Sequence, residues 1–144
     1  MFKLILWATD GSQHADRALE LAKSLASQYG ASLLVFHSVE FLTGPGARGA
    51  FPEAPDEDER QAKIAQQVKE LSEQGLKADL KVVHGGVSGA AHTIAEEAKE
   101  AGADLIVVGT RGHTALAGLL LGSVTQRLLH IAPCPVLAVP PEGH

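Results

Sequence analysis

The sequence predicts an α/β fold: an open, five-stranded parallel sheet with helices on both faces. Short and nearly continuous apolar runs, typical of strands buried on both faces, recur along the 144 residues. Between them lie segments whose apolar residues repeat at intervals of three and four, as on one side of a helix. Strands and helices that alternate in this way favour parallel strands joined by right-handed crossovers.

The first strand and helix are defined by clear boundary signals. Leu4–Ala8 is the apolar run, and Asp10 marks its end. Ser12 is the expected N-cap of the following helix, and Gly30 is its expected C-terminal stop. The apolar stripe of this helix, Gln13–Tyr29, comprises Ala15, Ala18, Leu21, Ala22, Leu25 and Ala26.

A long connection separates the second strand from the second helix. The strand is Ser32–Val39, and the segment 40–57 after it is rich in glycine and proline. Connections of this length are often lids or binding loops and are as often disordered, so both interpretations stay open. A highly charged helix is expected over 56–74, and its apolar stripe is Ile64, Ala65, Val68 and Leu71.

The second half of the chain predicts three more strands and two more helices. Ala78–His84 alternates polar and apolar residues, which suits a sheet edge. A helix capped by Ser88 should run to Ala101 and close at Gly102, before a strand over 105–108. The last elements are a helix, Ser123–Ile131, and a strand, Val136–Val139. No repeat or second domain is evident, so one domain over 1–144 is expected.

A glycine motif between the last two strands carries the most functional information. From 107 to 124 the chain reads VVGTRGHTALAGLLLGSV, in which two residues separate Gly109 from Gly112 and nine separate Gly112 from Gly122. Glycines can adopt positive φ and bring amides close to an anion, and amides at a helix start favour phosphate. Gly122 and Ser123 are expected to present such free N–H groups. No lysine follows the glycines as in a Walker A loop, so backbone and hydroxyl groups would hold the phosphate.

This motif resembles that of the universal stress protein family. The run ATDGS at 8–12 and the closing APCPVLAVP at 132–140 extend the resemblance over nearly the whole chain. The resemblance implies the strand order 3-2-1-4-5 and a Rossmann-like nucleotide-binding domain. Because the glycine and serine pattern is intact, it also implies the branch of the family that binds ATP.

The resemblance further implies which residues contact the nucleotide. The first-strand segment that contacts adenosine corresponds to Ala8, Thr9 and Asp10. The position whose backbone recognises adenine corresponds to Val39, or to Ser38, because this chain has His-Ser-Val where the family often has His-Val. The residues that match the phosphate and ribose segment are Gly109, Arg111, Gly112, His113, Gly122, Ser123 and Val124.

The strand order that the resemblance implies makes the first and fourth strands neighbours, so that residues at their ends would face each other across one crevice. Ligands of open parallel sheets lie beyond the carboxyl ends of the strands, where strand order reverses, and Asp10 and Gly109 both lie at such ends. A carboxylate for ribose hydroxyls or a metal would then face phosphate-binding amides. Asp10 is also the candidate contact for a Mg or Mn ion that bridges bound phosphates. The alternative interpretations are that Asp10 forms only an Asx-turn and that Ser123 is only an N-cap.

Two functions from different classes remain open. The first is a stress-response or signalling module that binds ATP or AMP with little or no turnover. The second is an enzyme that hydrolyses or transfers nucleotide phosphates. The chain has no GxSxG elbow and no lysine clamp, which favours the binding module.

Composition narrows the partners and the compartment. The net charge of −5 and the absence of a basic run argue against nucleic acid. The seven histidines show no HxH or HExxH spacing, which argues against a histidine metal site. A single cysteine, Cys134, and no apolar run of about 18 residues predict a cytoplasmic protein without a membrane span.

The last strand predicts self-association. Pro135 opens it, and Val136–Val139 carries no charge that would discourage pairing along a sheet edge. Two copies related by a two-fold axis would pair these strands in antiparallel fashion and join their sheets. A homodimer through Val136–Val139 is therefore expected, and the family resemblance also implies dimers of this kind.

Overall fold

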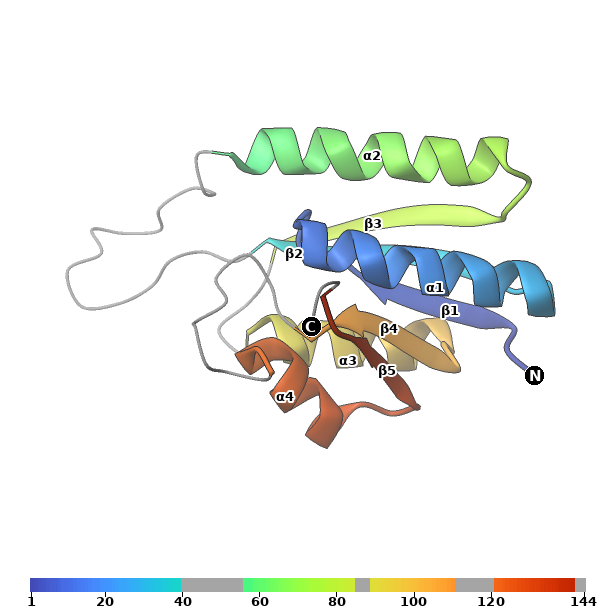
Figure 1. The fold of residues 1–144 in the computed structure, drawn as a ribbon. Coiled ribbons are helices and arrows are strands. Elements are labelled where there is room, and N and C mark those ends of the chain that lie inside the picture. The colour runs from blue at the N-terminus through green and yellow to red at the C-terminus, as the bar shows by residue number, and fades with distance from the viewer. Residues whose placement is uncertain (40–55, 85–88, 111–120, 142–144) are drawn as a thin grey trace.

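A computed structural model describes residues 1–39, 56–84, 89–110 and 121–141 of the chain (Figure 1). It confirms the predicted fold class, a five-stranded parallel sheet in the order β3-β2-β1-β4-β5. The strands are β1 (Leu4–Ala8), β2 (Ser32–Val39), β3 (Ala78–His84), β4 (Leu105–Gly109) and β5 (Val136–Val139). The helices are α1 (Gln13–Tyr29), α2 (Glu57–Glu73), α3 (Ala90–Ala101) and α4 (Ser123–Ile131).

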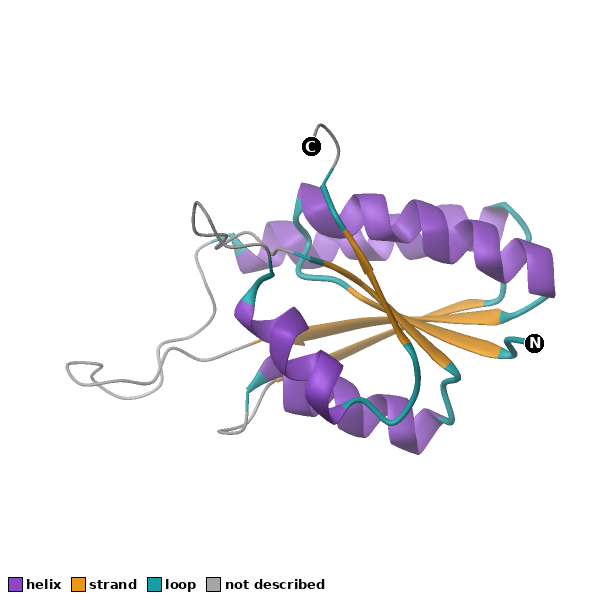
Figure 2. Cartoon of the chain, turned by 60° about the horizontal axis from the view of Figure 1, so that its bottom comes forward, coloured by secondary structure: helices purple, strands orange, loops and turns teal. Residues whose placement is uncertain are grey.

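Helices cover both faces of the sheet (Figure 2). Side chains of the central strand β1 alternate between the faces, because successive residues of a strand point in opposite directions. Ile5 and Trp7 pack into a core with α1 and α2, whereas Leu6 and Ala8 pack into a second core with α3 and α4. Strand order reverses at β1, which pairs with β2 on one side and β4 on the other.

The caps of α1 are as predicted, but one leucine of its predicted apolar stripe is not buried. Ser12 Oγ accepts a hydrogen bond from the Ala15 amide, and Gly30 takes the left-handed conformation at the C-terminus. Leu19 is buried, whereas Leu21 is 44% exposed. The prediction of Leu21 as a core residue was wrong, because Leu19 lies on the same side of the helix as Ala15 and Ala22.

The boundaries of α2, α3 and β4 differ by one residue from the prediction. The N-cap position of α3 is Gly89 rather than Ser88, and Ser88 lies outside the described residues. Gly102 closes α3 in the left-handed conformation, as expected. In α2, Ile64 and Leu71 are buried, but Ala65 is exposed, so the apolar stripe of this charged helix is narrower than predicted.

The carboxyl ends of β1, β2 and β4 lie along one edge of the sheet, together with the start of α4 (Figure 1). The Thr9 amide donates to the Phe36 carbonyl at 2.9 Å and thereby links the ends of β1 and β2. The Gly122 amide donates to the Thr110 carbonyl at 2.6 Å and links the start of α4 to the end of β4. Within the described ranges, no helix has the length and apolar character needed to cross a membrane.

Candidate functional site

The turn at 9–12, between β1 and α1, is held by its own side chains. Thr9 Oγ1 accepts the Gly11 amide at 3.0 Å, and Asp10 Oδ1 accepts the Ser12 amide at 2.9 Å. Asp10 thus forms the Asx-turn that was considered as its alternative role. Gly11 has φ +79°, which suits a residue without a β-carbon. The 9–12 turn is therefore a defined structure at the point where strand order reverses.

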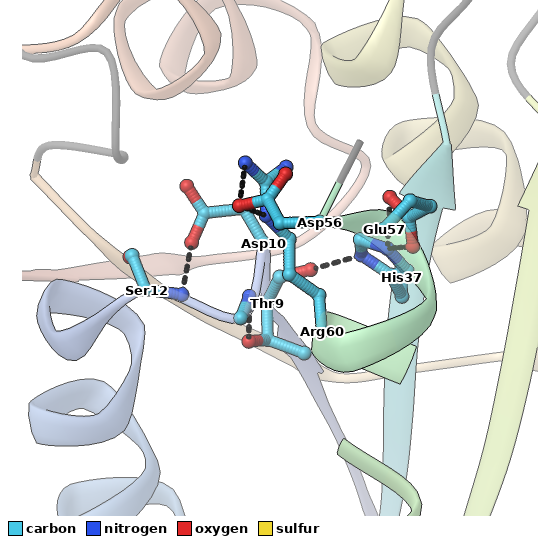
Figure 3. A network of polar contacts seen from close by, with 8 residues as sticks. Thr9, Asp10, Ser12, His37, Asp56, Glu57 and Arg60 are labelled. Carbon is cyan, nitrogen blue, oxygen red and sulfur yellow. Dashed lines mark hydrogen bonds and ion pairs between the residues drawn. The ribbon is translucent and has the colours of Figure 1, made fainter. Parts of the chain in front are cut away.

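One face of α2 packs directly on the 9–12 turn. Lys63 Nζ donates to the Gly11 carbonyl at 3.0 Å and contacts Asp16 Oδ2 at 2.7 Å. A β-carbon at Gly11 would lie 3.0 Å from Arg60 Cβ, so the two backbones approach closely. The Arg60 guanidinium is bound to Asp56, with contacts of 2.8 and 3.0 Å (Figure 3). The turn is thus enclosed between α1 and α2.

A buried histidine joins β2 to both the turn and α2. His37 is 2% exposed, its Nδ1 lies 2.8 Å from the Thr9 carbonyl oxygen, and its Nε2 lies 2.9 Å from Glu57 Oε2. Glu57, the first residue of α2, is 4% exposed (Figure 3). Sequence reasoning missed this pair, because it used His37 only to align the adenine-contacting position after it. The available signal was a polar residue at an inward-facing position of an apolar strand.

The two candidate adenine contacts lie at the end of β2. The Val39 side chain is buried, with 2% of it exposed, which leaves only its backbone to face a ligand. Ser38 alternates to the opposite face, and its Oγ is buried with no hydrogen-bond partner in the described part of the chain. A buried hydroxyl without a partner is costly, so Ser38 is well suited to a contact that a ligand supplies.

The described half of the glycine motif is shaped differently from the expectation. Gly109 ends β4, and its carbonyl accepts the Thr125 hydroxyl at 2.7 Å. The described glycines with positive φ are Gly11, Gly30, Gly75, Gly89 and Gly102. Gly109 therefore does not use the positive φ that glycine allows. The expectation of a free Gly122 amide is wrong, because this amide is bound to the Thr110 carbonyl. Arg111, Gly112 and His113 lie outside the described residues.

The start of α4 is a helix N-terminus without a side-chain cap among the described residues. Gly122 occupies the N-cap position with φ −68° and ψ 160°, and Ser123 is the first helical residue. Ser123 is thus not the N-cap, contrary to the alternative interpretation. No side-chain hydrogen bond to the cap is formed by the described residues, so the helix start at Ser123 and Val124 has no side chain occupying it.

Two surface cavities open among the described residues. The larger, about 370 Å³, lies beside the 9–12 turn and is lined by Gly11, Ser12, Gln13, His14, Asp56, Arg60 and Lys63. The smaller, about 180 Å³, lies between α1 and α2, away from the strand ends. Neither is lined by the described glycine-motif residues, and the remainder of that motif lies outside the described ranges. Within those ranges, no three His, Cys, Asp or Glu side chains are grouped to hold a metal ion.

The fold defines a doubly wound, Rossmann-like α/β protein with its candidate site at the switch in strand order. A profile of the Universal stress protein family matches residues 1–140. A Thermus aquaticus relative, "Universal stress protein in QAH/OAS sulfhydrylase 3'region", is 41% identical over 141 residues, which cover 96% of this chain and 99% of that protein. The chain therefore belongs to the universal stress protein family, as its motifs predicted.

Solved structures of the family share this fold, and two of them contain adenine nucleotides. The universal stress protein from Archaeoglobus fulgidus in complex with dAMP is 25% identical, with a TM-score of 0.67 over 96% of this chain and 98% of that chain. A universal stress protein in complex with cAMP is 26% identical, with a TM-score of 0.67 over 96% of this chain and 97% of that chain.

Proposed function

We propose that this protein is a stress-response or signalling module that binds an adenine nucleotide, ATP or AMP, with little or no turnover. The observation that carries the proposal is that the 9–12 turn and the start of α4 follow the carboxyl ends of the neighbouring strands β1 and β4, where strand order reverses. The family relatives that hold dAMP and cAMP support the same ligand class.

The described residues divide between the two ends of the ligand. Ser123 and Val124 receive the phosphates, because the start of α4 carries partial positive charge. The Asp10 carboxylate binds the ribose hydroxyls, and either Ser38 or the Val39 backbone contacts the adenine. Ala8 and Thr9 are buried, so they contribute backbone and shape rather than exposed side chains. Arg111, Gly112 and His113 complete the phosphate segment by family resemblance.

A Mg or Mn ion would be held mainly by the phosphate oxygens of the nucleotide. Asp10 Oδ1 already accepts the Ser12 amide, so this carboxylate supplies at most a shared oxygen to the ion. Such a site fits the preference of these ions for oxygen ligands and for retained water. Nucleotide binding should therefore persist without the metal, with weaker affinity for ATP than for AMP under metal-free conditions.

The described side chains beside the turn favour binding over catalysis. Both ring nitrogens of His37 are engaged, and the Lys63 ammonium is bound to Asp16 and to the Gly11 carbonyl. Neither group is placed to activate water or to stabilise a transferring phosphate. The alternative, an enzyme that hydrolyses or transfers nucleotide phosphates, would be favoured by a steady-state ATPase rate above about 1 per second.

Calorimetry with ATP, ADP and AMP, each with magnesium, tests the proposal. Absence of binding at millimolar ligand would refute it. Gly122→Val should abolish binding, because the side chain would block the approach of phosphate, while its φ and ψ of −68° and 160° are accessible to valine. Ser123→Ala should weaken binding by about ten-fold to a hundred-fold, the loss of one hydrogen bond to a charged group. Gln126→Ala, an exposed change on the same helix, is the control.

We also propose a homodimer through β5. This strand is an edge of the sheet, and its residues Val136, Leu137 and Ala138 are only half-buried in the single chain. An apolar edge without charge is a template for pairing, and a second copy would cover it. Among the described residues β5 pairs only with β4, so its outer side is the available one.

A further inference from the structure

The contacts of His37 give this residue a role that the nucleotide-contacting residues do not include. We propose that His37 and Glu57 are positioning residues, which hold the 9–12 turn and the first turn of α2 in register through one shared proton. This inference rests on the proposed nucleotide binding, because its functional consequence is the affinity of that site.

Burial makes the pair energetically significant. The side chains of His37 and Glu57 are 2% and 5% exposed, and Nε2 lies 2.9 Å from Oε2 and 3.2 Å from Oε1. A buried polar group that loses its partner bears its full desolvation cost, unlike a surface pair that water replaces. Loss of either contact of this pair would therefore leave a buried polar group without a partner and destabilise its geometry.

Counting hydrogens shows that the pair must retain a proton. The Thr9 carbonyl is only an acceptor, so Nδ1 must carry a hydrogen. The contact between Nε2 and Glu57 needs one further hydrogen, which resides on either the ring or the carboxyl group. Neutral histidine beside an ionised glutamate has only one hydrogen for two acceptors. Removal of the shared proton must therefore break one of the two contacts.

Breaking either contact would disturb the 9–12 turn. The Thr9 carbonyl immediately precedes Asp10, and the Thr9 amide is bound to Phe36 on the same strand as His37. The other end of the pair fixes the first residue of α2, the helix that encloses Gly11 through Arg60 and Lys63. His37 and Glu57 thus join β1, β2 and α2 around the 9–12 turn.

Several other ionisable groups lie around the 9–12 turn. Lys63 contacts Asp16, and Arg60 contacts Asp56, so these cations are bound to carboxylates other than Glu57. His84 on β3 is paired in register with Val39, two residues beyond His37. The charged or titratable side chains on the elements around the pair are Asp10, His14, Asp16, Asp56, Arg60, Lys63 and His84.

The test measures AMP affinity from about pH 5.5 to about pH 9 for wild type, Glu57→Gln and His37→Phe. A glutamine amide donates to Nε2 while neutral His37 donates from Nδ1, so Glu57→Gln makes both contacts without the extra proton. We expect wild type to lose affinity relative to Glu57→Gln as pH rises. The ratio of their dissociation constants removes the titration of AMP itself, whose phosphate has a pKa of about 6.

His37→Phe removes both contacts and leaves Glu57 without its partner. It should weaken AMP binding several-fold across the pH range, because the Thr9 carbonyl next to Asp10 and the first residue of α2 both lose the partner that holds them. The fluorescence of Trp7, the one tryptophan of the chain, checks that the variant is folded. If His37→Phe folds poorly, Glu57→Gln alone decides the question, because its shape is nearly unchanged.

The matched control is Glu97→Gln. Glu97 contacts Lys81 at 2.7 Å, is 10% exposed in its side chain, and lies on α3 away from the turn. It should bind AMP with the pH profile of wild type. A flat ratio between wild type and Glu57→Gln, or an equal change in Glu97→Gln, would overturn the inference while leaving the nucleotide site intact. If wild type binds no AMP, the proposed function fails and the inference fails with it.

Discussion

Replacing Gly11 with alanine adds one methyl group where α2 comes closest to the 9–12 turn. Gly11 has φ +79°, and the new β-carbon would lie 3.0 Å from Arg60 Cβ and 3.2 Å from Arg60 Cγ. Arg60 Cβ is attached to the helix backbone, so it cannot move aside as the tip of a side chain can. The variant must therefore shift either the turn or the start of α2.

The cost has two physically separate parts. A left-handed conformation costs a residue with a β-carbon about 1–2 kcal/mol, and crowding in a packed site adds about 1–3 kcal/mol. Gly30→Ala isolates the first part, because Gly30 has φ +67° and no atom lies within 4 Å of its added β-carbon. We expect a loss of unfolding free energy of about 1–2 kcal/mol for Gly30→Ala and about 2–5 kcal/mol for Gly11→Ala.

Urea unfolding followed by tryptophan fluorescence measures both losses. Trp7 is suited to this assay because it is fully buried in β1 and its Nε1 donates to the Ala15 carbonyl at 3.0 Å. AMP affinity should also fall in Gly11→Ala and remain unchanged in Gly30→Ala, which lies at the far end of α1. Equal destabilisation by the two substitutions would refute the close approach of α2 to the turn.

Two further predictions concern β5 and the cysteine beside it. Light scattering with size exclusion should give about twice the 15.0 kDa chain mass, and Leu137→Lys should return the protein to the monomer; a wild-type monomer would contradict the β5 interface. Burial, aided by the charge of Asp104, raises the pKa of the Cys134 thiol. Its alkylation at mildly alkaline pH should therefore be slower than that of a fully exposed cysteine and should accelerate in urea. Equal rates in the folded and unfolded protein would contradict this prediction.

The elements could be predicted from the sequence because each carries its own local signal, whereas their order in the sheet came from the family resemblance. Ser123–Ile131 and Val136–Val139 have the predicted bounds, and Ser12, Gly30 and Gly102 perform the predicted capping roles. Leu21 was misplaced because a stripe of small residues, mostly alanine, defines the buried side of α1 only loosely. Packing against the sheet decides whether Leu19 or Leu21 is buried, and the local periodicity of the sequence does not contain that information.

The sequence predicted where the strand and helix ends around the candidate site lie, but not their local geometry. The residue pattern located Asp10, Gly109 and Gly122 at strand and helix ends, and the structure brings those ends to one edge of the sheet. It did not show that the Gly122 amide is bound to Thr110 or that the Gly109 φ is not positive. Glycine allows many backbone conformations, so its presence alone does not select one.

The polar face of α2 explains why the sequence did not reveal the contact between His37 and Glu57. Glu57, Arg60, Lys63 and Gln67 recur at intervals of three and four, a pattern that by itself indicates a solvated helix surface. Instead, Glu57 contacts His37, Arg60 approaches Gly11, and Lys63 and Gln67 both contact Asp16.

This polar face contacts the 9–12 turn and the start of α1, while Ile64 and Leu71 pack into the core beside it. The His37 and Glu57 pair spans 20 residues and the connection between β2 and α2, so only the tertiary fold reveals it. This charged helix is thus held in place by polar contacts to the 9–12 turn and the start of α1 as well as by Ile64 and Leu71 in the core. For that reason, we expect substitutions on this face to alter ligand affinity more than substitutions at exposed positions of the same helix, such as Gln66 or Lys69.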